Sequence, residues 1–415
     1  MLAAGQLIPL SIDKPAVGGR MIARVDGQIV LVAGAIPGER ISARIERIAK
    51  GVAYADAVSI DEPSPDRRPA LADPRCGGCL YAHVAYARQL ELKCLVIADA
   101  FARIGRLPLA SPVRVAASPE EGYRMRARLH VRGGRLGFFR EGTHDICDAR
   151  ATRQLLPATS EVLGRVAAGL RSLGPDVVRE IELSENLDAS ERVVHFDAVP
   201  GTDPRALDRI ATTDGLSVAP YVTDRLSLDG RPPIALRRHV LAFAQGNRHL
   251  LHDFVSHVVA SVPRGSVVVD LYAGTGLFSI AAAVTRAARV TAVEGDRFAA
   301  ADLAVNAAAS GASVMAAHQA VEAFVDALAR GVHRQPAPPL ETIIVDPPRT
   351  GMSRDAMNGI LALRAPRIVY VSCDVATLAR DARRLVDGGS RIERVDAFDL
   401  FPNTPHVETV VVFTR

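Results

Sequence analysis

Residues 267–279, VVVDLYAGTGLFS, decide the fold of this chain. The segment begins as an apolar, β-branched run typical of a buried strand, turns on Gly274 and Gly276, and then opens a helix. Glycines at such a turn let a ligand come close to the backbone. The third glycine of the dinucleotide fingerprint is missing, and Asp270 suits the ammonium of a methionine-type ligand better than a pyrophosphate. We therefore expect a cofactor site at the two glycines.

The rest of the C-terminal region repeats this order of strand and helix. Short apolar strands, the first four each followed by a helical pattern, are expected at residues 266–274, 288–295, 342–348, 367–373 and 407–415. Such alternation predicts an α/β fold with a doubly wound sheet. Ligands of open α/β sheets bind beyond the carboxyl ends of the strands, so residues at those ends are the candidates for function.

Three side chains that can carry chemistry lie at such ends. Glu294 follows the glycines by roughly 20 residues, where an acid can accept ribose hydroxyls. Asp346 precedes two prolines, which cannot continue a central strand and so fix an extended turn. Cys373 ends the next strand. A free cysteine is commonly a small buried side chain, but at this edge, beside a methyl donor, it is also a candidate nucleophile.

A thiol in this place suits methylation at C5 of uracil. C5 is a poor nucleophile until a thiolate adds to C6, and a base must then remove the C5 proton before the enzyme is released. Glu408, just before the last expected strand, is the candidate base; the alternative is a solvated acid at a strand edge. For the nearby His406 we expect a structural hydrogen-bonding role.

The N-terminal half is predicted to contain two further domains. Residues 1–62 carry short alternating strands separated by Gly and Pro turns, which favour a small barrel. Residues 63–238 are expected to form a central α+β domain, with a C-G-G-C motif, a helix within residues 82–106 and two strands around the Gly133-Gly134 turn. Residues 239–415 form the third domain.

Together the motifs resemble those of the bacterial RNA (uracil-5-)-methyltransferase family, the RumA/TrmA type. The resemblance covers nearly the whole chain and rests on FAQGN (243–247), DLYAGTG (270–276), VE (293–294), DPPRTG (346–351), YVSC (370–373), TLARD (377–381) and FPNTPHVE (401–408). It implies a Rossmann-like class I methyltransferase that uses S-adenosyl-L-methionine (SAM). The cofactor contacts would come from Gln245, Tyr272, Glu294 and Asp346. By the same resemblance, Cys373 is the nucleophile and Glu408 takes the C5 proton.

The N-terminal barrel is similar to a TRAM domain, an OB-like RNA-binding module, and its Pro37-Gly38-Glu39 turn fits that type. Within the family, the branch that modifies ribosomal RNA carries this domain, whereas the tRNA branch usually lacks it. The resemblance therefore implies 23S ribosomal RNA as the substrate. A tRNA uridine methyltransferase of the same chemistry is the alternative.

The chain departs from the family pattern in two places. Asp374-Val375 follows the cysteine where the family usually has Asn-Pro. The ribosomal-RNA branch also typically holds a four-iron cluster on four cysteines, of which Cys76 and Cys79 match two, while Ala70 and Thr152 occupy the other positions. A cluster needs about four thiolates, so we expect none to be bound unless other cysteines, Cys147 or Cys94, substitute. The alternative for C-G-G-C is a tight turn with a redox-sensitive thiol pair.

A basic strand is the candidate RNA contact. Arg124, Arg126 and Arg128 alternate along it and so share one face, and residues 123–140 contain no acid. Such a face suits phosphate contacts; a solvated basic strand is the alternative.

Composition sets further bounds. The 415 residues carry a net charge of +4, which is compatible with an anionic partner. No apolar run reaches the roughly 18 residues of a membrane span, and no signal peptide is recognised. Five cysteines, an odd number, argue against a disulfide framework and for the cytoplasm. No obligate protein partner is indicated.

Two hypotheses from other functional classes remain. A non-catalytic RNA-binding protein on the same fold would not need Cys373 and Glu408. An amino-group methyltransferase with a D/N-P-P-[YFW] loop would carry an aromatic residue where Arg349 stands.

Overall fold

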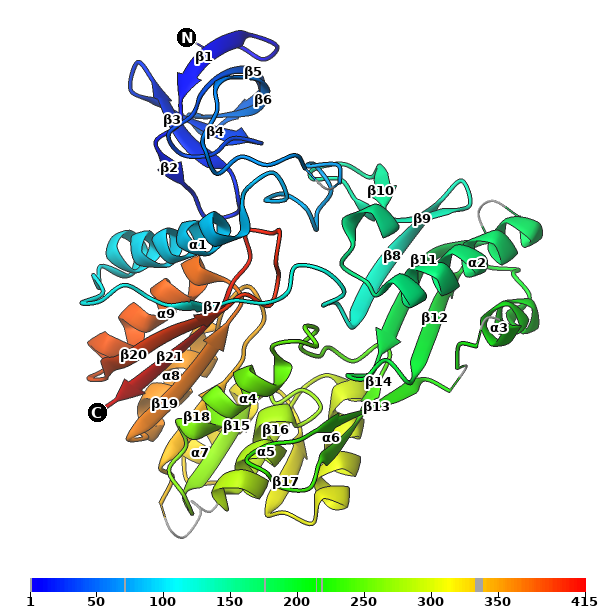
Figure 1. Cartoon of the computed structure of the whole chain (residues 1–415). Coiled ribbons are helices and arrows are strands. Elements are labelled where there is room, and N and C mark those ends of the chain that lie inside the picture. The colour runs from blue at the N-terminus through cyan, green and yellow to red at the C-terminus, as the bar shows by residue number, and fades with distance from the viewer. Residues whose placement is uncertain (1, 71, 175–176, 214, 218, 333–338) are drawn as a thin grey trace.

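The structure is a computed structural model that describes residues 2–70, 72–174, 177–213, 215–217, 219–332 and 339–415. Sheets of six, five and eight strands and one two-stranded ribbon form its framework. Helix α1 (Tyr86–Ala100) lies between the N-terminal sheet and the C-terminal sheet, and the central sheet stands to one side (Figure 1). None of the described helices is long and apolar enough to cross a membrane.

The N-terminal sheet contains six strands, in keeping with the short strands expected for this region. Its order is β1-β5-β6-β4-β3-β2, and the pairs among the described residues do not join its two edges. Alternate side chains such as Ile8, Leu10, Val30 and Val32 form its core. The strands are β1 (Leu7–Ser11), β2 (Lys14–Pro15), β3 (Met21–Val25), β4 (Gln28–Ala33), β5 (Arg40–Ala49) and β6 (Val52–Glu62).

The central sheet is antiparallel, in the order β10-β9-β8-β11-β12. The expected hairpin is confirmed, since Arg132 pairs with Arg135 across the Gly133-Gly134 turn. Helices α2 and α3 share a hydrophobic core with this sheet. The elements are β8 (Arg126–Arg132), β9 (Arg135–Phe139), β10 (Ile146–Asp148), α2 (Pro157–Leu173), β11 (Val178–Glu185), β12 (Arg192–Ala198) and α3 (Pro204–Thr213).

The C-terminal sheet confirms the doubly wound α/β prediction. Its order is β17-β16-β15-β18-β19-β21-β20-β7, and β21 runs antiparallel to both of its neighbours. The inner parallel strands β15, β18 and β19 are buried on both faces and mostly apolar, as central strands of such a sheet require. One face packs on α1, α7, α8 and α9, and the other on α4 and α5.

The elements of this region are β7 (Val115–Ala116), β13 (Tyr221–Leu226), β14 (Ile234–His239), α4 (Leu251–Ala260), β15 (Val267–Leu271), α5 (Leu277–Arg286), β16 (Arg289–Glu294), α6 (Arg297–Ser310), β17 (Val314–His318), α7 (Val321–Ala329), β18 (Thr342–Val345), α8 (Arg354–Leu363), β19 (Arg367–Ser372), α9 (Val375–Asp387), β20 (Arg391–Phe398) and β21 (Glu408–Thr414). Two of its pieces come from earlier in the chain. β7 pairs in parallel with β20, and Ile97 and Phe101 of the α1 segment join the same core as Tyr370 and Phe413.

Candidate active site

The glycine turn follows β15 and leads into α5. Tyr272, Gly274 and Gly276 all have positive φ, at 61°, 56° and 96°. A Cβ on Gly276 would lie 2.8 Å from Leu303 Cδ1, so this glycine allows the helix to pack. Apart from Gly274 and its two neighbours in sequence, no atom of the described residues lies within 4 Å of its Cβ position. Gly274 therefore borders space in which a ligand can approach the backbone.

Glu294, at the end of β16, is tied to this turn. Its Oε2 accepts a hydrogen bond from the backbone N–H of Gly274 (2.7 Å), and its Oε1 accepts one from that of Asp296 (2.7 Å). The two segments meet because β15 and β16 are neighbouring parallel strands. The carboxylate is thus fixed beside the glycine turn, where the sequence predicts a ribose contact.

Two further acids lie nearby: Asp270 is within β15, and Asp346 directly follows the neighbouring strand β18. Asp346 accepts a hydrogen bond from Gln245 Nε2 (3.1 Å), and Asp270 accepts one from Ser279 Oγ. Burial raises the pKa of each carboxyl to about 7, and the negative charge of Glu294 adds to both shifts. Among the described residues no donor reaches Oδ1 of Asp270. Acids that raise one another's pKa favour a positively charged ligand, and they fit the charges of SAM.

Cys373 lies between β19 and α9. It directly precedes Asp374, the N-cap of α9, whose side chain accepts a hydrogen bond from the N–H of Thr377 (2.8 Å). Aspartate and asparagine are both good N-caps, and proline is favoured but not required at the next position. The Asp374-Val375 departure therefore keeps the turn that presents the thiol.

The TLARD segment of α9 fixes the loop that carries Arg349. Thr377 Oγ1 donates a hydrogen bond to the backbone carbonyl of Arg349 (3.2 Å), and Asp381 accepts one from the N–H of Met352 (2.9 Å). Arg349 lies beside Cys373, where its positive charge opposes the rise of the thiol pKa. No role for Arg349 was predicted from the sequence; its position directly after the Asp346-Pro-Pro turn was the signal that could have pointed to it.

Glu408 is the first residue of β21 and belongs to the same strand pair as the cysteine. Ser372 pairs with Thr409, so Cys373 and Glu408 are the next residues at one end of that pair. Burial, together with the charge of Glu408, raises the pKa of Cys373 to about 12. Burial and the charge of Asp346 raise the pKa of Glu408 well above its usual range. In the free protein at neutral pH, Cys373 is therefore a thiol.

His406 makes one structural hydrogen bond, from its backbone N–H to Thr404 Oγ1 (3.2 Å); a hydrogen-bonding role for its ring stays a prediction. Its ring meets Phe401 edge-on, with 6.1 Å between centroids, and no hydrogen bond to its ring nitrogens occurs among the described contacts. Burial and the positive charge of Arg349 lower its pKa to about 4. The ring is therefore neutral at neutral pH.

The three arginines of the basic strand differ in their partners. Arg126 and Arg128 share one face, as expected, but both reach Glu182 of β11, at 3.4 and 2.5 Å. This acid reduces the positive charge of the face, and the sequence could not reveal it because it lies on another strand. Arg124 lies over the ring of Phe138 (5.7 Å), and its buried Nε has no hydrogen-bond partner within the described part of the chain.

Three of the cysteines gather in one buried cluster. Cys76 and Cys147 form a disulfide, with their Cα atoms 5.8 Å apart. The odd cysteine count argued against a disulfide framework, so this bond was not expected from the sequence. Cys79 is free beside them, and burial raises its pKa to about 12.

This cluster does not fit an iron–sulfur centre. Two of its three sulfurs are bonded to each other, Ala70 and Thr152 supply no thiolate, and Cys94 lies apart on α1. The residues that the structure describes contain no group of three His, Cys, Asp or Glu side chains able to hold a metal ion. Four thiolates are therefore not available at this place.

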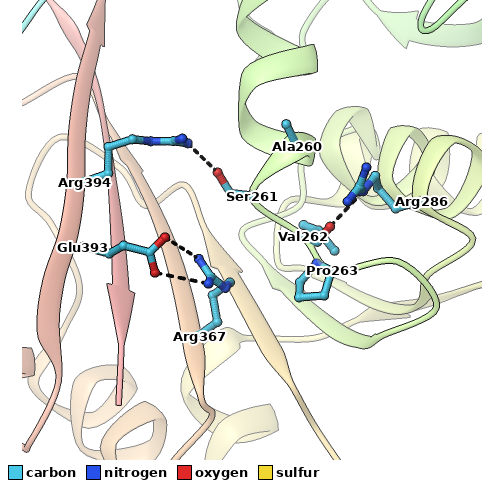
Figure 2. A pocket seen from close by; sticks show the side chains of 8 residues that line it. All are labelled: Ala260, Ser261, Val262, Pro263, Arg286, Arg367, Glu393 and Arg394. Carbon is cyan, nitrogen blue, oxygen red and sulfur yellow. Dashed lines mark hydrogen bonds and ion pairs between the residues drawn. The ribbon is translucent and has the colours of Figure 1, made fainter.

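A surface cavity of about 210 Å³ lies at the opposite edge of the C-terminal sheet (Figure 2). Its charged side chains are already paired: Arg367 contacts Glu393 at 3.1 Å, and Arg394 donates to Ser261 at 2.9 Å. Arg367 begins β19, whereas Cys373 follows its end. The cavity is thus a strand length away from the thiol and is not the place of chemistry.

Comparison with known proteins places these features in context. A family model described as tRNA (Uracil-5-)-methyltransferase matches residues 216–415, and a TRAM domain model matches residues 3–58. The 23S rRNA (uracil(1939)-C(5))-methyltransferase RlmD of Pseudomonas putida is 30% identical, over 97% of this chain and 93% of the relative. The RlmD of Methylococcus capsulatus is 32% identical, over 98% and 97%.

Among solved structures, the Pyrococcus abyssi tRNA (uracil-54, C5)-methyltransferase in complex with S-adenosyl-L-homocysteine superposes with a TM-score of 0.75. The match covers 98% of this chain and 99% of that one, at 23% identity. The likeness shows that the two chains share a fold over their full lengths.

Proposed function

The chain belongs to the RNA (uracil-5-)-methyltransferase family, and we propose that it methylates C5 of a uridine in 23S ribosomal RNA through a covalent bond from Cys373 to C6. It is a SAM-dependent RNA methyltransferase with an N-terminal TRAM domain. The observation that carries the proposal is the pairing of Ser372 with Thr409, since it sets a thiol and a carboxyl side by side.

The choice of RNA is supported by the full-length relatives at 30% and 32% identity, whose names specify 23S rRNA. A tRNA uridine is the second candidate, because the matched family model and the superposed archaeal structure both carry tRNA in their descriptions. In either case the enzyme meets its RNA in the cytoplasm, the location we propose for it.

The cofactor would lie against the carboxyl ends of β15, β16 and β18. SAM, when bound, supplies an electrophilic methyl group and a positive sulfonium charge. Glu294 is placed to accept ribose hydroxyls, and Asp346, held by Gln245, is placed to face the positive charges. Tyr272 and Gly274 supply the turn over which the ligand lies.

In the proposed reaction, Cys373 Sγ gives up its proton to solvent, and the resulting thiolate adds to C6 of the uracil. The electrons of the C5–C6 double bond move into an enolate, and C5 would then bond to the methyl group as the bond between that group and the donor's sulfonium sulfur breaks. Glu408, as a carboxylate, takes the proton from C5; the C5–C6 double bond re-forms and the C6–S bond breaks, which returns the thiolate. Arg349 stabilises that thiolate, because its charge lowers the thiol pKa.

RNA would reach this edge as an unpaired or flipped uridine, since C6 is not accessible within a stack. Phe243, two positions before Gln245, is 62% exposed and offers an aromatic face to a base. Arg124, Arg126 and Arg128 remain the proposed phosphate contacts, with Arg128 the most exposed of them.

The test uses 5-fluorouridine-substituted 23S rRNA and tRNA, each incubated with the protein and SAM. Fluorine at C5 cannot be removed as a proton, so a covalent protein–RNA adduct stable to denaturation is expected with 23S rRNA. Cys373→Ser should form none. An adduct with tRNA alone would select the second candidate, and no adduct with either RNA would refute the cysteine mechanism.

A further inference from the structure

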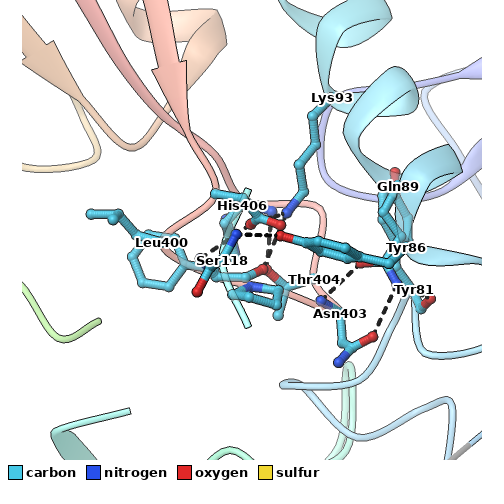
Figure 3. A network of polar contacts seen from close by, with 12 residues as sticks. Tyr81, Tyr86, Gln89, Lys93, Ser118, Leu400, Asn403, Thr404 and His406 are labelled. Carbon is cyan, nitrogen blue, oxygen red and sulfur yellow. Dashed lines mark hydrogen bonds and ion pairs between the residues drawn. The ribbon is translucent and has the colours of Figure 1, made fainter. Parts of the chain in front are cut away.

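The loop that joins β20 to β21 leads directly to Glu408. Phe398, the last residue of β20, pairs with Glu408, so both ends of the loop are fixed by one strand register. Between them, residues 399–407 pass over α1 rather than into solvent, and most of their side chains are buried. Figure 3 shows Gln89 and Lys93 of α1 beside Leu400, Asn403 and Thr404 of this loop.

A buried ion pair holds the start of the loop. Lys93 Nζ lies 2.5 Å from Asp399 Oδ1, and their side chains are 1% and 0% exposed. The same ammonium donates a hydrogen bond to the backbone carbonyl of Phe401 (3.2 Å). Lys93 thus binds both the first residue of the loop and the backbone two residues further on.

The middle of the loop is held by Gln89, which lies one helical turn before Lys93 on α1. Gln89 Nε2 donates to Asn403 Oδ1 (2.9 Å), and Gln89 Oε1 accepts from the backbone N–H of Asn403 (2.9 Å). Asn403 has a φ of 63°, a left-handed conformation that this double hydrogen bond helps to fix. The N–H of Tyr81 donates to its carbonyl as well (2.8 Å).

A third attachment links the loop to the cofactor side. Asn247 Nδ2 donates to the backbone carbonyl of Leu400 (3.2 Å) and to Ser118 Oγ (2.9 Å). Asn247 lies two residues after Gln245, which holds Asp346. The loop before the candidate base and the segment that binds the cofactor are therefore joined.

A buried ion pair contributes little to stability compared with an apolar pair of the same size, because both charges lose their hydration. Its strength is geometric: two charges that cannot reach water fix each other's position. A lysine on the buried face of α1 is therefore better explained by placement of the loop than by stabilisation of the fold.

We propose that Lys93 is a positioning residue, which acts through Asp399 and the Phe401 carbonyl to hold Glu408 where it can remove the C5 proton. The inference rests on the proposed role of Glu408 as the base. It concerns release of the methylated RNA, not attack by Cys373.

The decisive variant is Lys93→Met, which keeps the length of the side chain and removes its charge. We expect kcat to fall at least about tenfold, with the KM for RNA changed less than about threefold, because only the step that needs Glu408 is slowed. In a single turnover on unmodified RNA, the variant should accumulate covalent adduct. With 5-fluorouridine RNA its adduct should form within about threefold of the wild-type rate.

Lys14→Met is the matched control. Lys14, on β2 of the N-terminal sheet, forms an ion pair at 2.5 Å with Asp99 of α1, the helix that also carries Lys93. Both side chains of this pair are partly exposed. We expect wild-type values in every assay. If Lys93→Met folds poorly, the double variant Lys93→Met/Asp399→Asn removes both charges; it should fold and still accumulate adduct.

Release of product at the wild-type rate by these variants would overturn the inference. So would a parallel loss of adduct formation with 5-fluorouridine RNA, which would show a general structural role. A wild-type protein that forms no adduct with 5-fluorouridine RNA would instead remove the proposed function, and this inference with it.

Discussion

Cys373 and Glu408 leave one antiparallel strand pair at the same end, so the register of β19 and β21 sets the distance between thiol and carboxyl. A one-residue slip of β21 would turn Glu408 to the opposite face of the sheet. Since β21 is paired on both sides, to β19 and β20, such a slip would break two ladders. The two groups are therefore placed by the sheet itself.

Glu408→Gln should trap the enzyme on unmodified RNA. The glutamine cannot take the C5 proton, so attack and methyl transfer proceed but elimination does not. We expect a denaturation-resistant protein–RNA band, with turnover reduced by roughly 10²–10⁴. Cys373→Ser/Glu408→Gln, which lacks the nucleophile, should show no band. Normal turnover by the single variant would remove Glu408 from the role of base.

Alkylation of Cys373 should depend steeply on pH. Its pKa is raised to about 12, and only the thiolate reacts, so the rate should rise about tenfold per pH unit from pH 7 to 10. Glu408→Gln removes a negative charge that raises this pKa and should speed alkylation at pH 9. Peptide mass spectrometry after iodoacetamide treatment resolves Cys373 from the other cysteines. A rate that levels off below pH 8 would contradict the buried thiol.

Binding of S-adenosyl-L-homocysteine should strengthen as the pH rises from 6 to 8. Asp346 has a raised pKa of about 7, so its carboxylate becomes available to the ligand's ammonium in this range. The gain should be about tenfold for one titrating group. Calorimetry on Asp346→Asn should show weaker binding at pH 8 and a flatter profile, whereas Asp326→Asn, on the exposed outer side of α7, should match the wild type.

The two glycines of the turn should fail in different ways when changed to alanine. Gly276→Ala places a Cβ 2.8 Å from Leu303 at a φ of 96°, and should cost about 3 kcal/mol of stability. Gly274→Ala meets no atom within 4 Å and should cost about 1–2 kcal/mol, the strain of its positive φ. Its methyl group would nevertheless occupy the ligand's approach. Thermal unfolding measures the stability loss of each variant, and calorimetry measures its affinity for S-adenosyl-L-homocysteine. If Gly274→Ala and Gly276→Ala lost the same stability and the same affinity, Gly274 would not border open space.

The cysteine cluster predicts a defined thiol count. With Cys76 joined to Cys147, unfolding without reductant should expose three thiols, and unfolding with reductant five. Protein purified without air should show no iron and no absorbance band near 400 nm, because four thiolates are not available. Stoichiometric iron in such a preparation would overturn the assignment. Cys147→Ser should restore one free thiol at Cys76, as a control for the pairing.

The candidate site residues could be picked out from the sequence because they lie in short local patterns. The glycine turn, Glu294, Asp346 and Cys373 all follow apolar strands, and the edge at which they meet follows from the parallel sheet. The edge strand β17 and the strand β20, which lies between β21 and β7, were not expected. β17 contains small and half-exposed residues, and β20 is polar along much of its length, so neither shows an apolar run.

Long-range partners explain the remaining gaps. Lys93 looked like one polar position in a helical pattern, and its burial depends on Asp399, which lies 306 residues further along. The neutralising acid of the basic strand, Glu182, is likewise supplied by another strand. The edge strand β7 of the C-terminal sheet contains only two residues, which are too few to show the alternation of a strand in the sequence.

The pairing of β7 with β20 has a consequence for folding during synthesis on the ribosome. The apolar side of α1 and the strand β7 emerge early, yet the partners they need, α9 and β20, are translated hundreds of residues later. Until then this stretch has nothing to cover it, and contacts so distant in sequence form slowly. The catalytic sheet is thus completed only after β20 and β21 have been made, so a chain stopped short of them should be a substrate for chaperones and proteases rather than a partly active enzyme.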